Sequence, residues 1–312
     1  MLSATRPIAL AIALVTALAS AALLAGCGGS DDSAGNGRSA VAAFYPLAWV
    51  TGQVAGDEWE VTNLTGPGTE PHDLSLDIKQ TATLAEADLI VLEHDFQPAV
   101  DETVEANAPD AEIVDAADVV ELMPASEHEH EHDEAGHDHG DLDPHFWQDP
   151  LLMADLADAV ADRLVELDPD GAATYEDNAA ALRTELEALD QEYVDGLATC
   201  ERTTTVVSHE AFSYLARYGL QFEAIAGLSP DAEPTPADLA RLQQLITEDG
   251  ITTVFSERLA SSKMADSLAG DLGLETAVLD PVEGLSDETS DDDYLSLMGQ
   301  NLDALRKANG CQ

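Results

Sequence analysis

Six of the nine histidines in this 312-residue chain lie in one acidic segment, residues 126 to 149. Imidazole is the commonest side-chain ligand for zinc and similar divalent ions, and neighbouring carboxylates add oxygen ligands and an attractive field. The segment follows no apolar period over residues 126–142, which predicts an irregular loop that collects metal ions. The alternative is a solvated polar tail or an expression tag. The interior position of the segment and the mixed Glu, Asp and Gly spacing between its histidines argue against a tag. The five histidines of this loop are His128, His130, His132, His137 and His139.

The sixth histidine, His145, stands in a different context. It lies between Pro144 and the apolar pair Phe146 and Trp147. Apolar neighbours predict an ordered turn, so we expect this imidazole to be held at a fixed place.

The first 27 residues predict export. Arg6 is followed by an apolar run from Ile8 to Ala25, then by Cys27 and a Gly/Ser/Asp-rich linker over residues 28–39. This pattern resembles a bacterial lipoprotein signal peptide that is cleaved and lipidated at Cys27. An uncleaved anchor is the alternative, because about 18 apolar residues can just span a bilayer. We expect an extracytoplasmic protein, held by Cys27 on the outer face of the cytoplasmic membrane, with no later segment able to span it.

The other two cysteines agree with an extracytoplasmic location. Cys200 and Cys311 form an even pair in a compartment where disulfides persist, so we expect them to be bonded. Two unrelated thiols are the alternative.

Charge limits the possible partners. The chain has 62 acidic residues against 12 basic ones and a formal net charge of −50. Nucleic acid and anionic lipid headgroups would be repelled, whereas divalent cations would be attracted. A saline habitat can produce the same bias, so charge only supports the metal hypothesis.

Short apolar runs alternate with helical patterns in two series. This βαβα order predicts α/β lobes whose parallel sheets are covered by helices. The expected strands are 41–45, 59–64, 88–94, 112–117, 203–208, 221–226, 252–257 and 275–279; the expected helices are 46–55, 77–87, 97–107, 210–218, 236–248, 261–272 and 292–308.

A helical stretch separates the two series. Apolar residues recur at helical spacing over 150–199, and Asp168-Pro169 ends the first helix and is expected to cap the second. A helix over 169–197 would be roughly 40 Å long, which favours a rigid connection. A dimeric coiled coil is disfavoured because the pattern covers too few heptads, so we expect a monomer. The predicted lobes are residues 40–149 and 200–312, joined by linking helices over 150–199.

Several longer motifs carry a family resemblance. They are GTEPHDLSL with His72, DPHFWQDP with His145, DPDGAATYEDNAAAL, SHEAFSYLARYGL with His209, GLSPDAEPTPADL, and VLDPVEGL with Asp280. Together they resemble the metal-binding lipoproteins of zinc and manganese ABC transporters, the helix-backboned class of periplasmic-type substrate-binding proteins. The resemblance covers essentially all of residues 40–312. It implies two αβ lobes with parallel sheets, a long backbone helix, and metal in the cleft between the lobes.

The resemblance also implies a metal site. In that family the metal is held by residues at four of these motifs, here His72, His145, His209 and Asp280. Each lies near the end of a predicted strand, where the loops of αβ lobes face a common cleft. Three imidazoles and one carboxylate suit tetrahedral zinc. The fourth position is the most open one, since water, Glu70, Glu93, His94 or Glu210 could also fill it.

The implied function is zinc capture and delivery to an ABC permease. Manganese-type relatives usually have glutamate where this chain has His209, and zinc-type members commonly carry a histidine-rich loop, so Zn²⁺ is favoured over Mn²⁺. A zinc hydrolase is the second hypothesis, disfavoured because no HExxH or comparable signature is present. A metal-dependent adhesin is the third, and this role could coexist with transport. We expect no enzymatic activity.

Deleting residues 128–139 tests the role of the histidine-rich segment. Zinc sites without apolar anchors must be ordered on binding, so they should be weaker than a preformed site. Titration of the deletion variant with Zn²⁺ should leave one tight site and remove additional weak ones, and growth should suffer only when zinc is scarce. Loss of the tight site would make this segment the primary ligand set.

Overall fold

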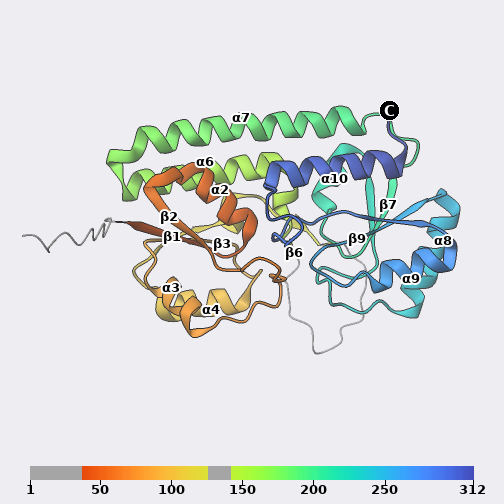
Figure 1. Cartoon of the computed structure of the whole chain (residues 1–312), viewed down its shortest axis with the longest axis horizontal. Coiled ribbons are helices and arrows are strands. Elements are labelled where there is room, and N and C mark those ends of the chain that lie inside the picture. Colours follow the sequence, from red (N-terminus) through yellow and green to blue (C-terminus); the bar gives the residue numbers. More distant parts are fainter. Residues whose placement is uncertain (1–36, 126–141) are drawn as a thin grey trace, which may run out of the picture. The chain divides into compact units, whose positions relative to one another are not determined.

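Two four-stranded parallel sheets organise the residues that the computed structural model describes, which are 37–125 and 142–312. Residues Arg38–Gln312 form one compact unit (Figure 1). The predicted signal peptide with Cys27, the linker as far as residue 36, and residues 126–141 lie outside the described residues. Within the described ranges, no helix has both the length and the apolar character needed to cross a membrane.

The first sheet has the strand order β2-β1-β3-β4, and all of its strands are parallel. Its inner strand β3 is buried along its whole length, as expected of a strand covered on both faces. The strands are β1 (Arg38–Ala42), β2 (Trp59–Asn63), β3 (Leu89–Leu92) and β4 (Glu112–Asp115); the helices are α2 (Tyr45–Ala55), α3 (Ile78–Ala85), α4 (Pro98–Asn107) and α5 (Ala116–Val119), with a 3-10 turn η1 (Gly56–Glu58).

The second sheet has the order β10-β9-β7-β8, again all parallel. Read in the opposite direction, from β8 to β10, this order corresponds strand by strand to that of the first sheet. The two lobes therefore share one topology. The strands are β7 (Thr204–Val207), β8 (Gln221–Ala224), β9 (Thr253–Ser256) and β10 (Glu275–Val278); the helices are α8 (Pro236–Asp249), α9 (Lys263–Leu272) and α10 (Tyr294–Asn309).

The helix expected over 210–218 is shorter and tighter than predicted. The structure has a 3-10 helix, η4 (Ser213–Tyr218), which ends at Gly219 with φ 91°. The backbone N–H of Glu210 donates to the carbonyl of Gly227 and so cannot bond within a helix. His209 therefore lies in a loop and not on a helix.

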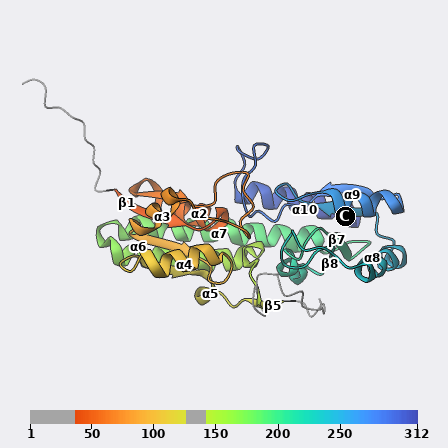
Figure 2. The ribbon, with the colours of Figure 1, turned by 90° about the horizontal axis from the view of Figure 1, so that it is seen from below.

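Two antiparallel helices connect the lobes. They are α6 (Pro150–Leu167) and the 26-residue α7 (Ala172–Leu197), separated by the 3-10 turn η3 (Pro169–Gly171). Helix α7 packs against α6, against α2 of the first lobe and against α10 of the second. Figure 2 shows the two lobes side by side along it. The lobe boundaries predicted from the sequence stay a prediction.

Asp168 does not cap the helix that follows it, contrary to expectation. Its carboxylate accepts two hydrogen bonds of 2.7 Å from the guanidinium of Arg38, at the start of β1, and one of 2.7 Å from the hydroxyl of Tyr175. Tyr175 in turn accepts from Nε1 of Trp59. This partly buried network fixes α6 and α7 against the first sheet, at the edge where its strands begin.

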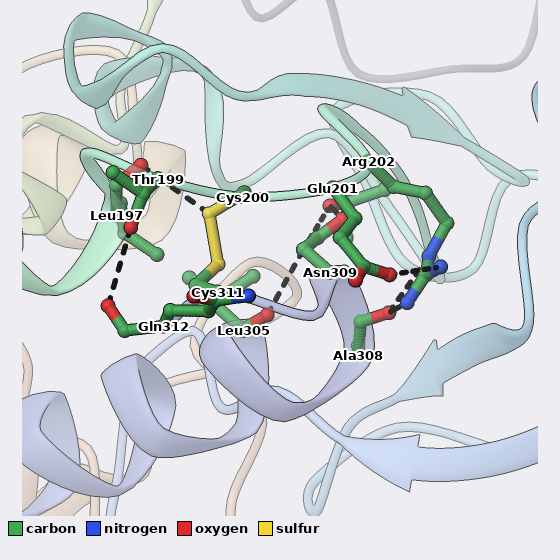
Figure 3. Close-up of a disulfide and its surroundings, with 11 residues drawn as sticks. Leu197, Thr199, Cys200, Glu201, Arg202, Leu305, Ala308, Asn309, Cys311 and Gln312 are labelled. Atoms are coloured by element: carbon green, nitrogen blue, oxygen red, sulfur yellow. Dashed lines mark hydrogen bonds and ion pairs between the residues drawn. A yellow bond between two sulfur atoms is a disulfide. The ribbon is translucent and has the colours of Figure 1, made fainter.

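A disulfide joins Cys200 and Cys311, the pairing expected from the cysteine count. It links the segment after α7 to the end of α10, where backbone bonds from Glu201 and Arg202 to the carbonyl of Asn309 hold the same two segments together (Figure 3). The C-terminal helix is thus tied to the backbone helix at one end of the molecule.

Replacing both cysteines with serine should lower the free energy of unfolding. The bond closes a loop with a sequence separation of 111 residues, and chain-entropy models give about 4–5 kcal/mol for loops of that size. Urea unfolding of the oxidised protein and of Cys200→Ser/Cys311→Ser measures the difference. A reducing agent should destabilise only the parent protein, and equal stability of the two proteins would contradict a structural role.

Candidate metal centre

Four loops from both lobes meet at one buried point. His72 lies in the loop after β2, and His145 lies between β6 (Leu142–Asp143) and the 3-10 turn η2 (Phe146–Gln148). His209 follows β7, and Glu283 follows β10. Because parallel strands end at a common edge, loops that follow them can bring side chains together there. The fold thus assembles residues more than 200 positions apart in the sequence.

The distances from the three imidazoles to the carboxylate of Glu283 are close to the edges of a tetrahedral metal shell. Nε2 of His72, of His145 and of His209 each lies 3.5 Å from Oε1 of Glu283. Zinc held at about 2.0–2.1 Å by four ligands requires ligand atoms about 3.3–3.4 Å apart. One candidate ligand atom from each residue lies within 4.8 Å of all the others. The side chains therefore need only small shifts to coordinate zinc.

Carboxylates orient two of the imidazoles. Nδ1 of His145 lies 2.7 Å from Oδ1 of Asp143, and Nδ1 of His209 lies 2.6 Å from Oε1 of Glu257. Glu257 also accepts from the hydroxyl of Ser208. Such outer carboxylates favour the proton on Nδ1, which leaves the Nε2 lone pair for a metal.

The centre is shielded from water. His72 is 4% exposed, Glu283 is 1% exposed, and His145 and His209 are fully buried. Phe96 packs with its ring centroid 4.8 Å from that of His72. The ring centroid of Trp147 lies 5.2 Å from that of His145 and 5.4 Å from that of Phe96. This apolar wall strengthens the electrostatic interactions inside the centre.

Burial and charge act in opposite directions on the pKa values of these residues. Burial lowers the pKa of His72. Burial acts the same way on His145 and His209, yet the pKa of each is raised, that of His209 strongly, because the carboxylates they face stabilise imidazolium. For Glu283 burial would raise the pKa, but the imidazoles hold it well below the ordinary value. Imidazolium on His145 or His209 and the carboxylate of Glu283 therefore stabilise each other in this centre.

Asp280, the expected fourth ligand, lies outside this group, and the carboxylate within the group is that of Glu283. Oδ2 of Asp280 accepts from Nε of Arg258 at 3.0 Å, and Oδ1 accepts from the backbone N–H of Val282 at 2.8 Å. Burial raises the pKa of Asp280 to about 6, although Arg258 acts in the opposite direction. The motif VLDPVEGL thus located the loop but not the residue that faces the histidines.

The other candidates for the fourth position also lie outside the group. Oε1 of Glu70 lies 3.9 Å from Nε2 of His72. Burial raises the pKa of Glu70 to about 7. Glu93 is buried, and burial holds its pKa well above the ordinary value. His94 belongs to a separate, exposed group with two aspartates. Glu210 follows His209 and lies outside the group as well.

The histidines expected to collect metal, from His128 to His139, lie outside the described residues, but both flanks of that segment are described. Its two ends pair as an antiparallel ladder of β5 (Met123–Pro124) with β6. The hydroxyl of Tyr214 bridges them, accepting from the N–H of Met123 and donating to the carbonyl of Asp143. The flank that follows the undescribed segment, β6, thus ends two residues before His145.

The fold and the site define a two-lobed substrate-binding protein with a metal centre between its lobes. Residues 40–308 match the family described as zinc-uptake complex component A, periplasmic. The chain belongs to this family.

Relatives of known name agree with that family. The chain is 37% identical over 306 residues to the zinc-binding lipoprotein AdcA of Streptococcus pneumoniae, covering 95% of this chain and 60% of AdcA. It is 37% identical over 296 residues to the high-affinity zinc uptake system protein ZnuA of Bacillus subtilis, covering 91% of this chain and 93% of ZnuA. The chain thus spans about three-fifths of AdcA and nearly all of ZnuA.

Solved structures share the fold. The crystal structure of the Zn(II)-bound ZnuA-like domain of S. pneumoniae AdcA matches with a TM-score of 0.74 and 34% identity, covering 88% of this chain and 99% of that domain. The laminin-binding protein Lmb of Streptococcus agalactiae, described as bifunctional with adhesin and metal-transporting activity, matches with a TM-score of 0.77 and 29% identity, covering 87% and 99%.

Zinc affinity should fall as the pH is lowered from about 8 to about 5, because protons compete for the imidazoles. The raised pKa values of His145 and His209 make this competition begin at a higher pH than for free histidine, and the lowered pKa of His72 delays its protonation. Zinc binding at pH 7 should therefore release more than one proton. Calorimetry in buffers of different ionisation enthalpy counts these protons, and an affinity that is flat between pH 7 and 5 would rule out a three-histidine site.

Proposed function

We propose that this protein captures Zn²⁺ outside the cytoplasmic membrane and delivers it to an ABC permease for import. One observation carries the proposal: three imidazole nitrogens lie at tetrahedral spacing from a single carboxylate oxygen in a buried centre. We assign His72, His145, His209 and Glu283 as the ligands. Asp143 and Glu257 orient two of them.

The donor set favours zinc over manganese. Imidazole suits zinc, whereas manganese favours carboxylate, carbonyl and water oxygens. Only one of the four assigned ligands is an oxygen donor. The relatives support this choice, since AdcA is named as zinc-binding and its ZnuA-like domain is Zn(II)-bound.

The same donor set favours binding without catalysis. Catalytic zinc sites keep one coordination position open to water, whereas closed four-ligand sites do not. Here four protein side chains are available to fill the shell. The family itself is one of uptake components, which fits a carrier of zinc and not a hydrolase.

Location and partners extend the proposal. The family is described as periplasmic and AdcA as a lipoprotein, which supports an extracytoplasmic protein anchored through Cys27. We propose that it acts as a monomer and that the permease is its partner. Adhesion is the second candidate, supported by the match to Lmb; binding of the purified protein to immobilised laminin tests it.

Titration of the metal-stripped protein with Zn²⁺ and Mn²⁺ tests the function. One tight Zn²⁺ site should appear, with weaker Mn²⁺ binding, and Zn²⁺ should raise the melting temperature because it binds only the folded state. His209→Ala should weaken Zn²⁺ binding by more than about 100-fold, since changing even an outer partner costs about 10–100-fold. His94→Ala is the matched control and should leave the tight site unchanged. Mn²⁺ binding as tight as Zn²⁺ binding, or tighter, would contradict the assignment of zinc as the transported metal.

A further inference from the structure

The loop that carries Glu283 contains an unfavourable backbone conformation. Val282, the residue before Glu283, has φ 61° and is fully buried. Left-handed backbone is disfavoured for any residue with a Cβ, and most of all for a β-branched one. Such a conformation persists only where the surroundings enforce it, so the partners of residues 280–283 explain how Glu283 reaches the histidines.

Asp280 supplies the enforcing contacts at one end of this turn. Oδ1 accepts the N–H of Val282 at 2.8 Å, and Oδ2 accepts Nε of Arg258 at 3.0 Å. The backbone of Asp280 is held as well, because its N–H donates to Oδ1 of Asn301 at 2.8 Å and its carbonyl accepts from Nδ2 of Asn301 at 2.6 Å. Asp280 is thus fixed by the second lobe and in turn fixes Val282.

Pro281, in the middle of the turn, is held by the segment that follows His145. The carbonyl of Pro281 accepts from Nε1 of Trp147 at 2.7 Å and from Nε2 of Gln148. Both donors lie just after His145 in the sequence. The peptide before Val282 is therefore fixed between the segment that carries one ligand and the segment that carries another.

One loop after β9 supports both ligands of the second lobe. Glu257 holds Nδ1 of His209, and its neighbour Arg258 holds Asp280. Arg258 therefore influences the position of Glu283 indirectly, because it holds Asp280, and Asp280 holds the N–H of Val282. Two adjacent side chains thus orient one ligand directly and the other through a turn.

We propose that Asp280 is a positioning residue for Glu283 and not a metal ligand. Together with Arg258 it holds the left-handed turn at Val282, and this turn points the glutamate carboxylate into the three imidazoles. The inference rests on the proposed function, because it concerns how the assigned zinc ligands are placed.

Cobalt substitution separates positioning from ligation. The purified protein and the variants Asp280→Ala, Glu283→Gln and Asp280→Ala/Glu283→Gln are loaded with Co²⁺, whose visible spectrum reports the ligands. The Asp280→Ala spectrum should shift toward that of Glu283→Gln, and Zn²⁺ affinity should fall by about 10–100-fold. The double variant should bind no more than roughly twofold more weakly than Glu283→Gln alone, because Asp280 acts only through Glu283.

A matched control variant separates a loss of overall stability from a specific change at the metal centre. Asp168 is also a buried aspartate paired with an arginine, at the far edge of the first sheet. Asp168→Ala should lower stability and leave the Co²⁺ spectrum unchanged. Where Asp280→Ala does not fold, Arg258→Met removes only one of the two partners and should give a smaller spectral shift in the same direction.

The remaining outcomes decide against the inference. A further large loss of affinity in the double variant would make Asp280 a ligand, and a wild-type spectrum for Asp280→Ala or Arg258→Met would show that the turn holds Glu283 without them. Failure of the parent protein to bind Zn²⁺ and Co²⁺ in one tight site would instead refute the proposed function, so the two failures are distinguishable.

Discussion

Burial of three imidazoles around one carboxylate oxygen is the constraint on which the rest of the structure depends. Taking charged groups out of water costs free energy, and an unpaired carboxylate in such a place is especially costly. Glu283 is 1% exposed and lies 3.5 Å from each of three Nε2 atoms. The centre is therefore stable only when cations, either protons or a metal, balance the carboxylates. This requirement links metal binding to proton release.

The fold meets this constraint by joining the loops of the two lobes through direct hydrogen bonds. The carbonyl of Pro281 accepts hydrogen bonds from Trp147 and Gln148, and the N–H of Gly68 donates to the carbonyl of Leu285 at 2.7 Å. These contacts connect the loop of Glu283 to those of His145 and His72. Helix α7 packs on both lobes. Because protein contacts already hold the ligands near their bound positions, zinc can select a largely preformed site instead of assembling it.

Much of this was predictable from the sequence, because it rests on local patterns. The alternation of apolar runs and helical periods predicted two parallel sheets, and the family resemblance implied the three histidines that come together in the structure. The fourth position depended on long-range contacts. Asp280 and Glu283 lie three residues apart on one loop, and only the pairing of Asp280 with Arg258 and the left-handed backbone of Val282 decide which one faces the centre. No propensity predicts a valine in that conformation.

The acidic surface attracts metal ions, whereas the buried centre selects among them. A formal net charge of −50 attracts every cation, and each arginine in the described ranges already lies in an ion pair with a carboxylate. That field is screened beyond about 8 Å at physiological salt and does not distinguish zinc from calcium or magnesium. Those harder ions prefer oxygen ligands, whereas the buried centre offers three nitrogens and one oxygen. Selectivity must therefore arise in the centre, where the outer carboxylates and the turn at Val282 fix the donor atoms, and not on the acidic surface that concentrates the ions.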